Sequence, residues 1–361
     1  MSLPMCDLHC DTATRIVLGV DLCDASLEVN LPAMRRGNVL LQVFAFYIPP
    51  SFPVGFRFAT VAKMIEKFRV QIEPYSDEIA IATSADQIMA NVRKGRISAV
   101  LAVENGNAIE NDLRNLEKFH DLGVRLLTLI HAKSNDWAIS SNDSAPAFDG
   151  LTDFGGDVVR VLNDLGMIID LSHAHDRTAA RVLELSAKPV VASHSCVHAL
   201  CPVPRNLRDE LIEGIGSSGG VIGINLFPSF LDIGYHRFAT ARGGELFDEL
   251  SRRERQAGTD VAEIDRLFQE FKVHFQKVAP NTEVGLARVI DHIDYIASRF
   301  GDDRVTLGSD FDGLPILPVG VHDCGAYAEL VQLMISRGYP EQRLQKICWD
   351  NFVRVFRSCC G

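Results

Sequence analysis

The octapeptide MCDLHCDT, residues 5–12, sets the pattern of the fold: a short, mostly apolar run that ends in one imidazole and one carboxylate. Side chains on a strand alternate between two faces, so we expect His9 and Asp11 to point the same way. A divalent metal such as zinc accepts both ligand types. A single His-x-Asp pair also fits a surface turn or a hydrogen-bonded pair, so its interpretation depends on the rest of the chain.

Seven more apolar runs follow this stretch, and most are continuous rather than alternating. Continuous runs are typical of strands buried on both faces of a parallel sheet. The expected strands are residues 5–11, 39–46, 97–104, 124–131, 167–173, 189–194, 220–226 and 304–310. The expected helices are residues 58–73, 84–93, 153–165, 176–186, 284–299, 326–336 and 344–356. This repeat predicts an α/β fold, a (β/α)8 TIM barrel that forms a single domain over residues 1–361.

The segment 227–280 does not fit the repeat. It is rich in charged residues, and its apolar residues recur at helical spacing, which predicts a helical insertion after the seventh strand. The apolar stripe favours packing over a cofactor site. Its members are Leu246, Leu250, Ile264, Leu267, Phe268, Phe271 and Phe275.

Potential metal ligands stand at the ends of most expected strands. Catalytic groups of TIM barrels come from the carboxyl ends of several strands, which meet at one mouth of the barrel. Each residue alone also fits a helix cap, a buried structural histidine or a turn, but together they favour a metal site. They are His9 and Asp11 on the first strand, then Glu104, His131, His173, His194 and Asp310 on the third, fourth, fifth, sixth and eighth.

The remaining histidines are weaker candidates. His175 and His198 compete for the same roles, but the first lies beyond its strand end and the second lies in the following helix or loop. The others are expected to be surface or helix histidines. They are His120, His236, His274, His292 and His322.

Composition excludes several other classes of protein. The net charge of −11 and the lack of Lys or Arg runs argue against a nucleic-acid partner. No apolar stretch reaches the roughly 18 residues of a membrane span, and the N-terminus lacks the pattern of a signal peptide. The nine cysteines contain no Cys-x-x-Cys pair, which favours reduced thiols. We therefore expect a cytoplasmic protein without a membrane partner.

Short motifs along nearly the whole chain resemble the membrane dipeptidase (renal dipeptidase) family of zinc metallopeptidases, which are amidohydrolase-like barrels. The matching motifs occur in family order. They are DLHCD at 7–11, AVENG at 102–106, LTLIH at 127–131, IDLSH at 169–173, ASHS at 192–195, PRN at 204–206, GSDFDG at 308–313 and DNFVRVF at 350–356.

The resemblance implies two Zn²⁺ per chain, with other divalent metals left open. His9 and Asp11 would bind one ion, His173 and His194 would bind the other, and Glu104 would bridge both. As substrate-binding and catalytic groups, His131 would polarise the scissile carbonyl, Arg205 would meet the substrate carboxylate and Asp310 would handle the proton. Two zinc ions about 3.5–4 Å apart can share a hydroxide that is available near neutral pH. An ordinary surface role remains the alternative for Arg205.

The sequence thus predicts a zinc-dependent dipeptidase that cleaves dipeptides with a free C-terminal carboxylate, including L-D dipeptides as the resemblance implies. One alternative is a related barrel amidohydrolase acting on N-acyl amino acids or cyclic amides. Another is a non-catalytic metal-binding barrel, although such a protein has no reason to keep both Asp310 and His131. The resemblance also implies a homodimer. Segment 227–280 leaves the identity of the substrate open.

Overall fold

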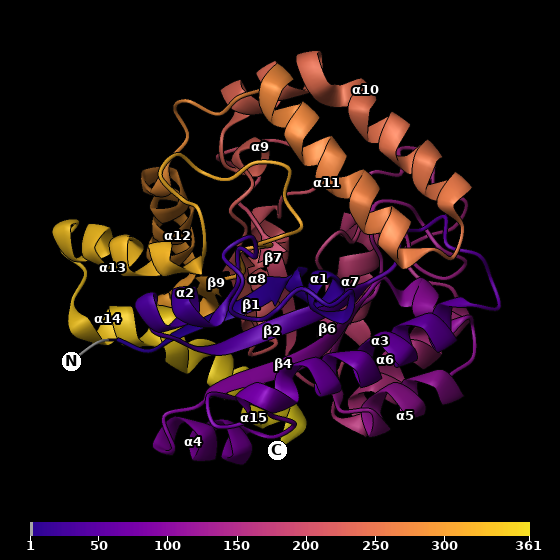
Figure 1. The fold of residues 1–361 in the computed structure, drawn as a ribbon, viewed down its shortest axis with the longest axis horizontal. Coiled ribbons are helices and arrows are strands. Elements are labelled where there is room, and N and C mark those ends of the chain that lie inside the picture. Colours follow the sequence, from indigo (N-terminus) through magenta and orange to yellow (C-terminus); the bar gives the residue numbers. More distant parts are fainter. Residues whose placement is uncertain (1–2) are drawn as a thin grey trace.

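The structure, a computed structural model, describes residues 3–361 and contains a parallel barrel with the strand order β1-β2-β4-β5-β6-β7-β8-β9 (Figure 1). These eight strands confirm the predicted TIM barrel. They are β1 (Met5–Cys10), β2 (Val39–Tyr47), β4 (Ile97–Glu104), β5 (Val124–Thr128), β6 (Ile168–Asp170), β7 (Val190–Ser195), β8 (Val221–Ile224) and β9 (Val305–Leu307). The three-residue strand β3 (Ile79–Ile81), which was not predicted, pairs with β4 outside the barrel order.

The two ends of the chain close the barrel. Just beyond β9, the amide of Asp310 donates to the His9 carbonyl at 3.1 Å, and the amide of Asp11 donates to the Phe311 carbonyl at 2.8 Å. The fully buried Asp7 carboxylate accepts hydrogen bonds from the amide and hydroxyl of Ser309, at 2.8 and 2.6 Å. Residues about 300 positions apart are thereby held side by side at the barrel mouth.

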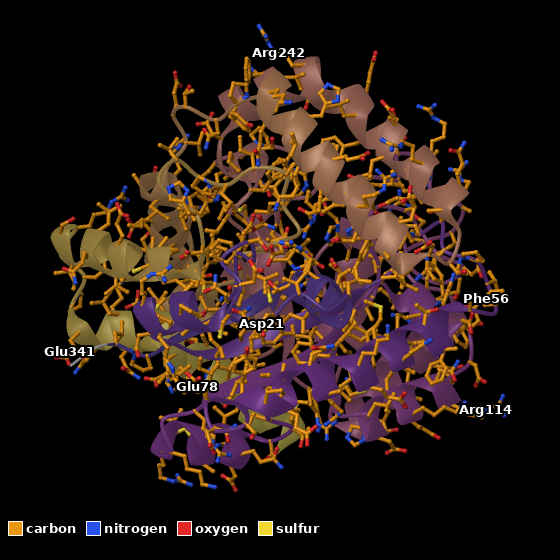
Figure 2. All side chains as sticks on the ribbon, viewed as in Figure 1. Asp21, Phe56, Glu78, Arg114, Arg242 and Glu341 are labelled. Carbon is orange, nitrogen blue, oxygen red and sulfur yellow. The ribbon has the colours of Figure 1, made fainter. Side chains whose placement is uncertain are left out.

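Helices surround the strands, and charged side chains such as Arg114, Arg242 and Glu341 project outward (Figure 2). The predicted outer helices are present as α3 (Arg57–Ile72), α4 (Ala85–Arg93), α6 (Asp153–Leu165), α7 (Asp176–Leu185), α12 (Leu286–Phe300) and α13 (Tyr327–Ser336). Four more were not predicted because they are short or contain glycines, which weakens a periodic signal. These are α1 (Thr12–Val17), α2 (Leu31–Arg36), α5 (Arg114–Asp121) and α8 (Asp209–Ser217).

The helix predicted over residues 344–356 is present, and it contains a π-helical turn that the sequence did not indicate. The segment forms α14 (Glu341–Gln345), a π-helical turn at Lys346–Asp350 and α15 (Asn351–Cys360). Inside the π turn, the Ile347 carbonyl accepts a hydrogen bond of 2.7 Å from the Thr306 hydroxyl of β9. This contact supplies a partner from outside the helix, where the regular ladder is interrupted.

Segment 227–280, expected to be helical, contains α9 (Pro228–Leu231), α10 (Ile233–Ala257) and α11 (Val261–Val278). The helices α10 and α11 pack against each other and lie together on one side of the barrel (Figure 1). The Lys272 ammonium of α11 forms a 2.7 Å ion pair with Glu28, which follows α1. The pair fixes α11 to the barrel. No helix within the described residues combines the length and apolarity that crossing a membrane requires.

Candidate metal centre

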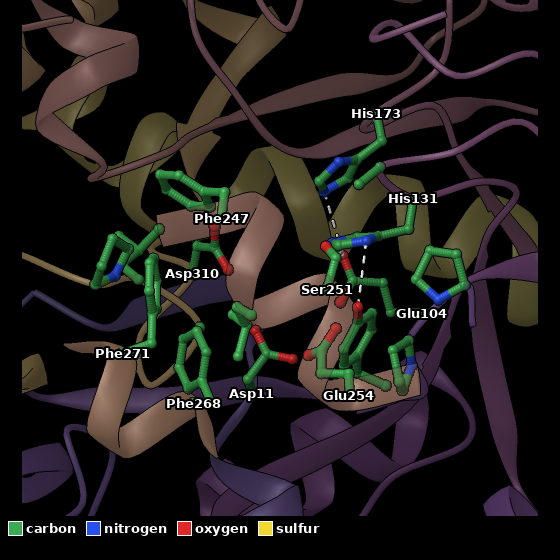
Figure 3. A pocket seen from close by; sticks show the side chains of 18 of the residues that line it. Asp11, Glu104, His131, His173, Phe247, Ser251, Glu254, Phe268, Phe271 and Asp310 are labelled. Carbon is green, nitrogen blue, oxygen red and sulfur yellow. Dashed lines mark hydrogen bonds and ion pairs between the residues drawn. The ribbon is translucent and has the colours of Figure 1, made fainter. Parts of the chain in front are cut away.

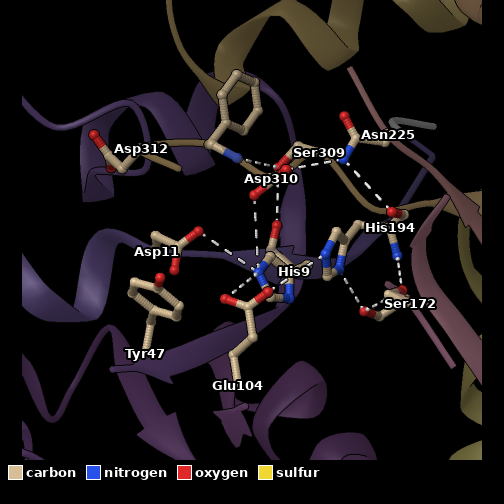
Figure 4. A network of polar contacts seen from close by, with 12 residues as sticks. His9, Asp11, Tyr47, Glu104, Ser172, His194, Asn225, Ser309, Asp310 and Asp312 are labelled. Atoms are coloured by element: carbon tan, nitrogen blue, oxygen red, sulfur yellow. Dashed lines mark hydrogen bonds and ion pairs between the residues drawn. The ribbon is translucent and has the colours of Figure 1, made fainter. Parts of the chain in front are cut away.

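Glu104, the last residue of β4, lies beside His9 in the candidate site (Figure 4). It is only 3% exposed. Its two carboxylate oxygens face different histidines: Oε2 is 3.6 Å from His9 Nε2, whereas Oε1 is 3.3 Å from His173 Nε2 and 3.6 Å from His194 Nε2. One carboxylate can therefore serve two neighbouring groups of ligands, as predicted for a bridging residue.

His9 lies where β1 brings it next to Asp11, with 3.6 Å between His9 Nε2 and Asp11 Oδ2. Both ring nitrogens of His9 are buried, and neither has a hydrogen-bond partner among residues 3–361. Two atoms bound tetrahedrally to one zinc at about 2.1 Å are about 3.4 Å apart. The donor types, their spacing and the unsatisfied nitrogens therefore fit a divalent cation, because buried polar atoms otherwise have partners.

His194 of β7 is held by a hydrogen-bonded chain. The Ser193 hydroxyl donates to Asp170 Oδ2 at 2.6 Å and lies 2.7 Å from His194 Nδ1. Because that hydroxyl proton is used by the carboxylate, its oxygen accepts from the Nδ1–H of His194. The lone pair of His194 then resides on Nε2, which faces Glu104. A histidine fixed in this way is typical of metal ligands.

His173 completes the cluster from outside the sheet. The predicted strand 167–173 is wrong at its end, because β6 stops at Asp170 and His173 lies in a turn with a φ of +65°. This left-handed conformation is unfavourable for residues other than glycine. It brings His173 Nε2 to 2.9 Å from His194 Nε2. The two histidines thus face the same point as Glu104 Oε1.

Electrostatics at the site follow from burial and from the opposed charges. Burial favours neutral His9, but the Glu104 and Asp11 carboxylates outweigh it and raise the pKa of His9 well above its usual value. Burial also raises the pKa of Glu104, yet the neighbouring histidines, His9 foremost, bring it well below its usual value. Burial lowers the pKa values of His173 and His194 strongly, so both remain neutral and available as ligands.

Asp310 lies on the His9 side of the cluster, with 3.9 Å between its Oδ1 and His9 Nε2. The Asn225 amide donates to the other oxygen, Oδ2, at 2.9 Å. Burial raises the pKa of Asp310 well above the usual range. The predicted strand 304–310 is too long, since β9 ends at Leu307 and Asp310 has a φ of +65° in the following loop. A Cβ atom on Gly313 would collide with the Asp11 carboxylate, so this loop needs glycine there.

His131 lies on the opposite side of Glu104, with 3.9 Å between His131 Nε2 and Glu104 Oε1. It too lies beyond its strand, because β5 ends at Thr128 and not at residue 131 as predicted. The Tyr47 hydroxyl is 3.4 Å from His131 Nδ1. Burial raises the pKa of Tyr47 well above its usual value, so the phenol keeps its proton and can donate it to Nδ1. His131 Nε2 then carries the proton that faces the site.

Arg205 is buried, 7% exposed, and is not an ordinary surface arginine. Its guanidinium donates to the Ser195 hydroxyl and to the His194 carbonyl, both at 2.8 Å. The Nε atom is buried without a hydrogen-bond partner among residues 3–361. The guanidinium also lies over the Phe230 ring, 5.6 Å from its centroid. It is therefore fixed beside the cluster with donors to spare.

Six of these side chains line one cavity of about 460 Å³, whose other wall comes from α10 and α11 (Figure 3). They are Asp11, Glu104, His131, His173, Arg205 and Asp310. His175 and His198 instead line a second hollow together with Arg208, so the structure does not bring them to the cluster. His292 is buried in α12, where its Nδ1 accepts the Val197 amide at 3.0 Å.

Sequence reasoning did not identify Tyr47, Asn225 and the Asp170–Ser193 pair. Tyr47 ends β2 in register with Glu104, and Asn225 follows β8 directly. These were the two expected strands for which no polar end residue was proposed. The polar residue just past each strand end would have been a usable signal.

A TIM barrel with convergent His, Asp and Glu side chains at its mouth defines a metal-dependent barrel hydrolase. The family model for membrane dipeptidase (peptidase family M19) matches residues 1–359. The chain belongs to this family.

Curated relatives are dipeptidases. Dipeptidase tcpJ of Claviceps purpurea is 31% identical over 287 residues, which cover 80% of this chain and 57% of that protein. Mouse Dipeptidase 3 is 29% identical over 335 residues, which cover 92% of this chain and 58% of that protein. The chain thus spans less than two thirds of the length of both. Among solved structures, dipeptidase AC, a metallopeptidase, is 25% identical with a TM-score of 0.81 and full coverage of both chains.

Proposed function

We propose that this chain is a dipeptidase that holds two Zn²⁺ ions and hydrolyses dipeptides with a free C-terminal carboxylate. The observation that carries the proposal is the placement of Glu104, whose two oxygens face two different groups of ligands in one buried site. Membership of the dipeptidase family supports the same activity. L-D dipeptides are included because the resemblance in sequence motifs implies them.

The ligand assignment follows the two sides of Glu104. His9 and Asp11 would hold one ion on the Oε2 side, and His173 and His194 would hold the other on the Oε1 side. Bound divalent ions supply the Lewis acidity that makes water a nucleophile near neutral pH and polarises a carbonyl. They would also balance the negative charges that Asp11, Glu104 and Asp310 bring to the cavity.

The other side chains have roles that their contacts define. His131 Nε2–H, set by Tyr47, donates to the carbonyl oxygen of the scissile bond and stabilises the charge that develops there. Asp310 accepts the proton of the attacking water through Oδ1, because Asn225 occupies Oδ2, and delivers it to the leaving amine. Arg205 binds the substrate carboxylate, which places the C-terminal residue at a fixed distance from the reacting carbonyl.

Metal content and product release together test this function. The purified protein should contain two divalent ions per chain and release free amino acids from L-L and L-D dipeptides. It should leave N-acyl amino acids largely intact, which separates a dipeptidase from an amidohydrolase of N-acyl substrates. A protein with fewer than two metals that stays inactive after zinc addition would contradict the proposal.

We also propose a reducing, cytoplasmic location and a homodimer. All nine cysteines are free, and seven of them are buried. Burial raises the pKa of the Cys6 thiol to about 12, which keeps it protonated and unreactive. Cell fractionation tests the location, and light scattering coupled to size-exclusion chromatography tests the dimer.

A further inference from the structure

Glu254 is the one charged residue on the buried face of α10. The other buried positions of this helix are Tyr235, Ala239 and Gly243, all uncharged. Glu254 is 9% exposed and lines the same cavity as the metal ligands. Figure 3 shows it reaching toward that cavity from the helical wall, on the same side as Ser251. A carboxylate thus faces the site from the segment that the barrel repeat does not account for.

The Glu254 carboxylate has neither a hydrogen bond nor an ion pair with any other residue of the described chain, 3–361. The other acid that α10 and α11 give to the cavity lining has a partner, because Asp265 accepts a hydrogen bond from Gln269 at 3.3 Å. Burial raises the pKa of Glu254 to about 7, and the charge of the exposed Lys133, which lines the same cavity, acts in the opposite direction. A buried carboxylate without a partner is costly and commonly marks a binding site.

The wall that α10 and α11 give to this cavity is largely aromatic and aliphatic. Phe247, Leu250, Phe268 and Phe271 line the same cavity as Glu254. Phe247 and Phe271 pack edge to face with their centroids 4.9 Å apart. Such a wall suits a methylene chain, and a carboxylate within it suits a cationic tip. Lysine and arginine side chains combine both features.

Glu254 and Arg205 serve opposite sides of the barrel mouth. The Glu254 charge contributes to raising the pKa of Tyr47, so Glu254 lies near the end of β2. Arg205 instead binds the His194 carbonyl and the Ser195 hydroxyl of β7. In the ring of eight strands, β2 and β7 are second and sixth, four places apart and therefore diametrically opposed.

We propose that Glu254 binds the side-chain cation of the N-terminal residue of the substrate, so that dipeptides beginning with lysine or arginine are preferred. The inference rests on the proposed function, since it takes the scissile carbonyl to lie at His131 and the substrate carboxylate at Arg205. The N-terminal side chain then extends toward the aromatic wall of α10 and α11.

The test compares Lys-Ala with norleucine-Ala, which has the same chain length without the charge. The wild type should favour Lys-Ala in kcat/KM by about tenfold to a hundredfold, the range of a charge-assisted hydrogen bond. Glu254→Gln should remove this preference and change norleucine-Ala by less than about threefold. Glu249→Gln is the matched control, because Glu249 is an exposed carboxylate on the same helix. It should keep the wild-type preference.

Calorimetric binding provides a readout that does not need turnover. In the metal-loaded Asp310→Asn background, Lys-Ala should bind more tightly than norleucine-Ala, and adding Glu254→Gln should equalise the two Kd values. Circular dichroism verifies that the variants are folded.

If Glu254→Gln lowers kcat/KM equally for both dipeptides, the carboxylate binds the α-ammonium group and the proposal is overturned. An unchanged preference for Lys-Ala in this variant would also overturn it. If no dipeptide is hydrolysed but binding still follows Glu254, the cation site stands and the dipeptidase function falls. If dipeptides are hydrolysed without a preference for lysine, the dipeptidase function stands and the cation site at Glu254 is refuted.

Discussion

Replacing Ser193 with alanine removes the middle of the Asp170–Ser193–His194 chain. The change deletes the 2.6 Å bond to Asp170 and leaves His194 Nδ1 without its 2.7 Å partner. Asp170 keeps three donors: the Thr128 hydroxyl at 2.7 Å, the Ser172 amide at 3.0 Å and the Ser193 amide at 2.8 Å. The carboxylate therefore stays satisfied, and the main loss falls on the histidine.

The loss has a definite size. A buried donor without a partner costs about 1–3 kcal/mol. His194 can avoid this cost by moving its proton to Nε2, but that removes the lone pair that faces Glu104 and the metal. We therefore expect metal affinity to fall about tenfold to a hundredfold, which is also the usual effect of losing an outer hydrogen bond to a ligand histidine.

Competition with a fluorescent zinc chelator measures the apparent Kd of both ions. Thr128→Val is the matched control, because it removes one hydrogen bond from the same buried Asp170 without touching His194. The control should lose some stability but retain its metal affinity. If Ser193→Ala binds zinc within about twofold of the wild type, the hydrogen-bonded chain does not orient His194 and this reasoning is wrong.

Three further outcomes are expected. Asp310→Asn should lower kcat by about 10²- to 10⁴-fold with both metals retained, as metal analysis would show, whereas loss of metal would make Asp310 a ligand. Gly313→Ala should lower metal content after dialysis, because its Cβ would collide with the Asp11 carboxylate; Gly156→Ala, where the nearest atom is 3.6 Å away, should not. Burial lowers the pKa of His292 to about 4, against about 6.5 when unfolded. Its contribution to stability is complete above pH 6.5 and is lost as the pH falls toward 4, by up to about 3 kcal/mol. Urea unfolding with chelator present should show this loss, and His292→Gln should flatten the profile.

The barrel was predictable because its strands are buried and mostly apolar. Every residue of β1, β4 and β7 is buried, so the continuous runs in the sequence report the sheet directly. The same rule misplaced the strand ends near His131 and His173. Leu129, Ile130 and Leu171 are buried loop residues, and apolar loop residues cannot be told from strand residues by periodicity.

Glu254 lay outside the reach of sequence reasoning for a different reason. On the helical pattern it is one acid among many in a charge-rich segment, and Glu249 five residues earlier is fully comparable in sequence. Only the way α10 rests on the barrel buries one and exposes the other. Burial of a single helical residue is a tertiary property, so local propensity and spacing do not determine it.

The metal centre shows why such a site needs the whole chain. His9 and Asp310 are 301 positions apart, and the hydrogen bonds between Asp7 and Ser309 hold β1 next to the loop that follows β9. Two residues of the site, His173 and Asp310, have left-handed backbones at a φ of +65°, which costs about 1–3 kcal/mol each. Folding alone gains nothing from that strain, and a glycine at either place would relieve it. The side chains of His173 and Asp310 therefore indicate that these loops are shaped by what they bind. Glycine at either position should stabilise the metal-free protein and weaken metal binding or turnover.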